Sequence, residues 1–106
     1  MSQHIALADI LIDLEKELRE LRLWEKEPPS ADALASVQPF AVDTLNFSQW
    51  LQFIFIPRLY ELIEARAALP GNCGVAPMAE EYFQPMGLNS ENLISHLRRI
   101  DVLLTR

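Results

Sequence analysis

Leucines near the start of the chain recur with the spacing of an α-helix. Alternating intervals of four and three residues place them on one helical face, and the set is Leu7, Leu11, Leu14, Leu18 and Leu21. Charged residues occupy most positions between them, so one side of this helix is buried and the other faces water. The pattern extends from about Ile5 to Lys26, and we expect Pro28 and Pro29 to end the helix because proline has no amide hydrogen.

A second helix is predicted from Asn46 towards Leu69, where Pro70 and Gly71 follow. Asn46 is a good N-cap residue, and Gln49 stands three positions later, as in a capping box. The polar residues in the two halves of this helix do not lie on the same face. Before Pro57 they are Ser48, Gln49 and Gln52; after it they are Arg58, Glu61 and Glu64, on nearly the opposite side.

Two explanations fit this reversal of the polar face. Pro57 removes one backbone hydrogen bond and kinks the helix, which re-aims its second half. Alternatively, the first half is surrounded by protein, and Gln49 and Gln52 are buried with hydrogen-bond partners. Apolar side chains cover most of the circumference there, which favours a central, mostly buried segment; they are Phe47, Trp50, Leu51, Phe53, Ile54, Phe55 and Ile56.

The remaining chain predicts shorter pieces and one further long helix. Ser30 is a suitable N-cap for residues 31–35, the chain is expected to be extended around Pro39, and Pro77 fits the first turn of a short helix through residues 80–83. The last helix begins near Ser90, and its inward stripe is Leu93, Leu97, Ile100 and Leu104. The sequence therefore predicts an all-α fold, a small helical bundle of three long helices plus one or two short ones, in a single domain spanning residues 1–106.

The charge balance argues against nucleic acid and membrane as partners. Nine Lys and Arg stand against fifteen Asp and Glu, a net charge of −6, which repels phosphate and anionic lipid. Arg98, Arg99 and Arg106 gather near the C-terminus, where basic residues ordinarily complement the helix dipole. The N-terminus lacks the pattern of a signal peptide, and the longest purely apolar run is residues 53–56, so we expect a cytoplasmic protein.

No residue pattern indicates catalytic, metal-binding or cofactor chemistry. Cys73 is the only cysteine, so no intramolecular disulfide can form, and its neighbours do not supply the positive charge that activates a thiol. His4 and His96 are the only imidazole bases, and no Glu-x-x-His pair is present. Glu61 and Glu64 share a solvated face. We therefore expect no catalytic residues, no metal site and no cofactor.

Several short motifs together resemble the YqcC-like family of small bacterial proteins. They are Leu23-Trp24, Phe40, Asp43-Thr44, Gln49-Trp50-Leu51-Gln52, Pro57-Arg58, Leu69-Pro70 and residues 76–81. The resemblance implies a helical bundle with no established activity, whose gene often neighbours that of a tRNA pseudouridine synthase. It suggests an accessory role in tRNA modification, and the acidic charge favours contact with a basic protein rather than with RNA.

The motif residues have two interpretations. In the structural one, Asp43 or Thr44 caps backbone donors ahead of the second helix, and Phe40 and Phe47 clamp its entry. In the functional one, polar side chains line a groove for a partner. The candidate partner-binding residues are Asp43, Gln49, Trp50, Gln52 and Arg58.

The favoured function is that of a non-enzymatic helical interaction protein. The apolar excess on the second helix would then be covered by self-association or by a partner protein. The alternative is a small enzyme or ligand-binding bundle, in which Asp43 acts as an acid–base group together with Glu80 or Glu81.

Overall fold

The computed structural model describes residues 3–38, 41–71, 74–87 and 89–105, and every regular element in them is helical. The elements are α1 (Gln3–Glu20), α2 (Ala31–Leu34), α3 (Phe47–Trp50), the π-helix η2 (Leu51–Phe55), α4 (Ile56–Glu64), α5 (Val75–Phe83), the 3-10 helix η3 (Gln84–Met86) and α6 (Glu91–Thr105). Because α3, η2 and α4 follow one another without interruption, the described chain has three long helical stretches and shorter pieces, which confirms the predicted fold class.

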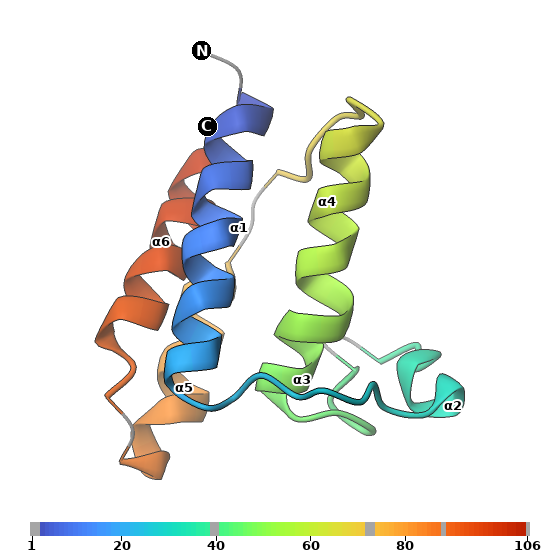
Figure 1. Cartoon of the computed structure of the whole chain (residues 1–106), viewed down its shortest axis with the longest axis vertical. Helices are drawn as coiled ribbons and strands as arrows, with labels where there is room; N and C mark the ends of the chain where they lie inside the picture. Colours follow the sequence, from blue (N-terminus) through green and yellow to red (C-terminus); the bar gives the residue numbers. More distant parts are fainter. Residues whose placement is uncertain (1–2, 39–40, 72–73, 88, 106) are drawn as a thin grey trace.

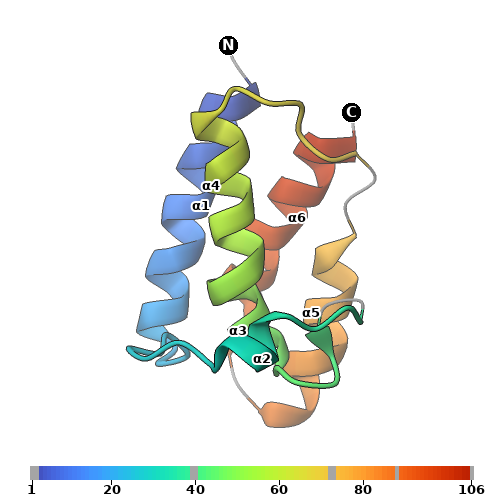
Figure 2. The same ribbon diagram turned by 90° about the vertical axis from the view of Figure 1, so that its right-hand side faces the viewer.

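The long stretches stand side by side with alternating direction (Figures 1 and 2). α1 runs antiparallel to both α4 and α6 and packs against each of them, while α5 packs against α6. The start of α1 and the end of α6 lie at one end of the bundle. α2, α3 and α5 gather at the opposite end, which we call the distal end.

The two predicted leucine-rich stripes form the centre of the core. Leu7, Leu11 and Leu14 of α1 are fully buried and Leu18 is 1% exposed. The stripe of α6 is equally enclosed, with Leu93, Leu97, Ile100 and Leu104 at 2% exposure or less. Leu21, the last member of the first stripe, is half-buried beyond the end of α1.

The first two long helical stretches both end earlier than expected, so the prediction that the prolines terminate them is wrong. α1 ends at Glu20, and Arg22 then takes a left-handed conformation with φ of 61°. The amide of Leu23 donates to the carbonyl of Leu18, and that of Arg22 donates to Arg19, which is a Schellman motif. α4 ends in the same way at Glu64, with Arg66 at φ of 52°.

A π-helix and the burial of Gln52 together account for the reversal of the polar face at Pro57. The amide of Ile56 donates to the carbonyl of Leu51, five residues earlier, so η2 holds more residues per turn than an α-helix. Side chains after η2 are therefore rotated around the axis relative to those before it. This element was not predicted from the sequence. The expected burial is confirmed for Gln52, which is 7% exposed, but not for Gln49, which is only half-buried.

Four residues named in the sequence analysis, Pro39, Phe40, Cys73 and Arg106, lie outside the described residues.

Candidate interaction site

The start of α3 is fixed by the predicted capping box. The side chain of Asn46 accepts the amide hydrogen of Gln49 at 2.8 Å, and the amide of Asn46 donates to Oε1 of Gln49 at 2.9 Å. Two otherwise unpaired backbone donors are thereby satisfied. Gln49 also reaches Glu25, because its Nε2 donates to a carboxylate oxygen 3.4 Å away.

Gln52 is held by the backbone of Glu25. The Glu25 amide donates to Oε1 of Gln52 at 2.9 Å, and Nε2 of Gln52 donates to the Glu25 carbonyl at 2.7 Å. Both polar ends of this buried side chain are therefore used inside the protein. This supports the structural interpretation of Gln52, which fastens the segment after α1 onto η2.

Trp50 belongs to an aromatic cluster at the distal end. Its ring stacks on Phe55 at a centroid distance of 5.0 Å and on Phe47 at 5.7 Å. Phe47 also contacts the rings of Tyr82 and Phe83 on α5, at 5.8 and 6.1 Å. The cluster joins α3 and η2 to α5, and Trp50 is half-buried within it.

Asp43 and Thr44 hold a turn in place instead of capping the helix, which corrects the expectation for these residues. The Ser36 hydroxyl donates to Oδ1 of Asp43, and the Thr44 hydroxyl donates to the carbonyl of Ala33 at 2.7 Å. These bonds attach the turn that precedes α3 to the region of α2. The helix itself is capped by Asn46, as described above.

The structure brings four of the five candidate partner-binding residues to the distal end and separates the fifth. Asp43, Gln49, Trp50 and Gln52 lie in the turn before α3, in α3 itself and in η2. Arg58 is exposed in the first turn of α4, nine residues beyond Gln49, which is about 13 Å along a helix axis.

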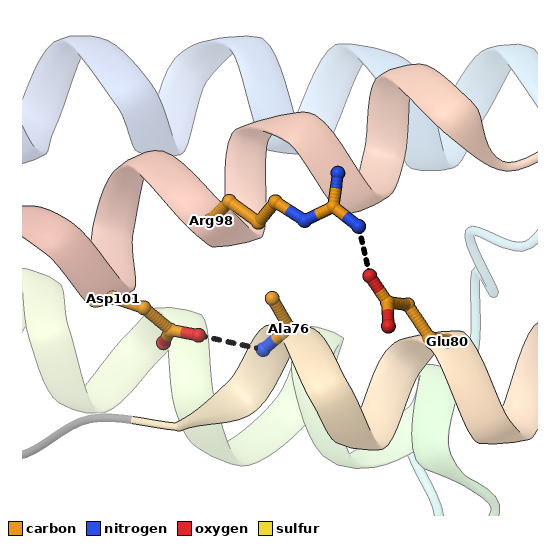
Figure 3. A network of polar contacts seen from close by, with 4 residues as sticks. All are labelled: Ala76, Glu80, Arg98 and Asp101. Atoms are coloured by element: carbon orange, nitrogen blue, oxygen red, sulfur yellow. Dashed lines mark hydrogen bonds and ion pairs between the residues drawn. The ribbon is translucent and has the colours of Figure 1, made fainter.

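The N-terminus of α5 is capped by a side chain of α6, an arrangement that the sequence analysis missed (Figure 3). Asp101 accepts the amide hydrogens of Val75 and Ala76, at 2.9 and 2.8 Å. The next residue of α5, Pro77, has no amide hydrogen to satisfy. One turn further on, Glu80 of α5 forms an ion pair with Arg98 of α6.

These contacts give no support to a catalytic pair of Asp43 with Glu80 or Glu81. Asp43 binds Ser36 near α2, and Glu80 binds Arg98 on α6, while Glu81 is exposed.

Within the described ranges, no group of His, Cys, Asp or Glu side chains is placed to hold a metal ion. None of the helices in those ranges has the length and hydropathy that a bilayer crossing requires.

An apolar groove opens between the turn before α3 and helix α5. Its volume is about 200 Å³, and its lining residues are Val42, Leu45, Asn46, Phe47, Met78 and Tyr82. Val42 is 63% exposed, although its neighbours Leu45 and Phe47 are buried. Sequence patterns on single helices could not indicate this groove, because its two walls come from segments more than 30 residues apart.

A family model, a related sequence and a solved structure each match nearly the whole chain. A model of the DUF446 family, described as tRNA pseudouridine synthase C, matches residues 6–103. The uncharacterised protein YqcC of Escherichia coli K12 is 32% identical over 103 residues, which are 97% of this chain and 94% of that protein. The solution NMR structure of E. coli YqcC matches with a TM-score of 0.86, over 98% of this chain and 89% of that one.

Two further relatives match about two thirds of the chain. An uncharacterised protein of Haemophilus influenzae is 41% identical over 71 residues, 67% of each chain. A Pectobacterium carotovorum protein named tRNA pseudouridine synthase C is 39% identical over 70 residues, which make up only 19% of that protein. From the similarity to E. coli YqcC in both sequence and fold, we conclude that the chain belongs to the YqcC-like family.

Proposed function

We propose that this chain is a non-enzymatic accessory protein that binds a tRNA pseudouridine synthase. The match to the Pectobacterium protein carries the proposal, because a segment similar to this chain there forms 19% of a polypeptide that bears the synthase name. Two parts of one polypeptide meet at high effective concentration without a strong interface. Parts that work together as separate chains must instead bind each other, so this chain would bind the synthase directly.

The charge of the chain supports a protein contact rather than an RNA contact. Its net charge of −6 repels tRNA phosphates at moderate salt. A protein that handles tRNA presents basic surface, because phosphate contacts need Lys and Arg. An acidic accessory protein is attracted to such a surface, which raises the rate and the selectivity of association.

The test uses the chain and the separately purified pseudouridine synthase C of the same bacterium. Both are treated with nuclease, mixed at micromolar concentration, and analysed by size-exclusion chromatography with light scattering. We expect a complex that survives nuclease, and a higher kcat/KM of the synthase for tRNA when the chain is present. A mixture that elutes as two separate proteins, with unchanged synthase kinetics, overturns the proposal.

Self-association is the competing way to cover apolar surface. Light scattering on the chain alone separates the two cases. A stable dimer that does not open when the synthase is added would favour self-association, whereas a monomer that enters the complex favours the accessory role.

A further inference from the structure

Basic residues are missing from two long stretches of the sequence. Residues 27–57 and 67–97 contain no Lys and no Arg, but they contain six acidic residues: Glu27, Asp32, Asp43, Glu80, Glu81 and Glu91. The first stretch supplies α2, α3 and η2, and the second supplies α5, η3 and the start of α6. Since α2, α3 and α5 meet at the distal end, this end has carboxylates of its own but no cations from these segments (Figure 2).

The apolar groove described above opens in this acidic setting. Asp43 directly follows Val42 in one wall, and Glu81 directly precedes Tyr82 in the other. Both carboxylate residues are exposed, and neither belongs to the Glu80–Arg98 ion pair. The groove therefore combines a mainly apolar lining with an exposed acidic residue next in sequence to each wall.

The size of the groove indicates what it can accept. Small-molecule sites usually measure roughly 300–1,000 Å³, whereas this groove measures about 200 Å³. That volume suits one or two large apolar side chains of a protein, the usual form of an anchor in an interface. The carboxylates beside it suit Lys or Arg on either side of such an anchor.

We infer that this groove is a docking site for a basic segment of a partner protein. An apolar side chain of the segment enters between Val42 and Tyr82, and flanking Lys or Arg residues approach Asp43 and Glu81. RNA suits this site poorly, because its phosphates would approach the acidic residues Asp43 and Glu81, which neighbour the groove lining in sequence. The inference rests on the proposed function in one respect, namely that the segment belongs to the protein that the chain assists.

NMR titration of the full chain with three synthetic peptides tests the site directly. The first peptide has a Leu-Phe pair flanked by several Lys residues, the second replaces this pair by Ser-Gly, and the third replaces the lysines by Glu. We expect amide shifts confined to residues 41–47 and 78–82, and binding of the Ser-Gly peptide weaker by about tenfold or more. Equal affinity for the Ser-Gly peptide, or shifts centred on α1 and α6, overturns the inference.

Matched variants separate the apolar from the electrostatic contribution. Val42→Ser removes an exposed side chain that lines the groove, and should lower the affinity for the first peptide about tenfold. Val37→Ser, at a position that is 94% exposed and outside the groove, should leave this affinity unchanged. Asp43→Asn with Glu81→Gln keeps shape but removes charge, and should reduce the salt dependence of binding. Glu61→Gln with Glu64→Gln on α4 makes the same charge change elsewhere and serves as its control. Groove variants that bind like their controls overturn the inference.

The same variants mixed with the synthase distinguish the two proposals. If the peptide binds in the groove but the wild-type chain does not bind the synthase, the proposed function fails and the docking site stands. If the wild-type chain and Val42→Ser bind the synthase equally well, the docking site fails and the proposed function stands.

Discussion

The Oδ2 atom of Asp101 lies 2.8 Å from the amide nitrogen of Ala76, so a carboxylate on α6 caps the first turn of α5. Its other oxygen accepts from Val75, and Pro77 has no amide hydrogen. The donors at the first three positions of α5 are thereby accounted for. Because Met78 and Tyr82 line the groove from α5, this cap also helps to fix one wall of the proposed docking site.

Replacing Asp101 should therefore loosen α5. Asp101→Ala leaves two partly buried amides without their acceptor, and we expect a loss of about 1–3 kcal/mol in the free energy of unfolding. Asp101→Asn retains one acceptor oxygen and should lose less. Urea unfolding measures the loss, and hydrogen exchange should speed up first at Val75 and Ala76. Asp9→Ala, at an exposed position of α1, is the control, and an equal loss there would contradict the capping role.

The pair of hydrogen bonds between Gln52 and Glu25 predicts a similar loss of stability where the segment after α1 is attached to η2. Gln52→Leu keeps the approximate volume of a buried side chain but leaves the amide and carbonyl of Glu25 unpaired. We expect a destabilisation of about 1–3 kcal/mol by urea unfolding. Gln84→Leu, at an exposed position, should change stability little. A Gln52→Leu protein as stable as the wild type would show that these bonds contribute nothing net.

Local signals were predictable from the sequence, whereas contacts between distant segments were not. The capping box of Asn46 and Gln49 and the stripe of Leu93, Leu97, Ile100 and Leu104 depend on residues within one helix, and both are as expected. The burial of Gln52 followed from the apolar residues around it, but its partner is the backbone of Glu25, 27 residues away. The Asp101 cap is likewise a contact between distant segments, since Asp101 lies 26 positions from Val75 and 25 from Ala76.

The helix ends illustrate a different limit of sequence reasoning. Gly is the usual residue at the left-handed position that closes a Schellman motif, but Arg22 and Arg66 take it here. Arginine gives no signal for that conformation, so the sequence predicts helix ends only at the prolines further on. The π-helix gave no signal either, because its apolar sequence is equally compatible with an α-helix.

The left-handed arginines lead to a prediction of stabilising substitutions. An L-residue in this conformation is strained by roughly 1–2 kcal/mol, whereas Gly is unstrained but loses more entropy on folding. We expect Arg22→Gly and Arg66→Gly each to raise the free energy of unfolding by about 0.5–1 kcal/mol. Thermal and urea unfolding measure the change.

Arg58→Gly is the matched control for these substitutions. Arg58 lies inside α4, so the same exchange there should lower stability by about 1 kcal/mol. If all three exchanges destabilise the protein equally, the backbone at Arg22 and Arg66 stores no strain that glycine relieves.

The contact between Tyr60 and Glu15 predicts a pH dependence of stability in the alkaline range. The Tyr60 hydroxyl donates to Oε2 of Glu15 at 3.2 Å. Burial, followed by the charge of Glu15 and this hydrogen bond, raises the pKa of Tyr60 from 10.0 to about 12. Because the folded pKa lies above the unfolded one, the stabilisation is fully present below a pH of about 10 and is lost as the pH rises towards 12. Urea unfolding at stepped pH should show this loss in the wild type and in Tyr82→Phe, but a smaller one in Tyr60→Phe. An equally steep loss in Tyr60→Phe would show that other groups cause it.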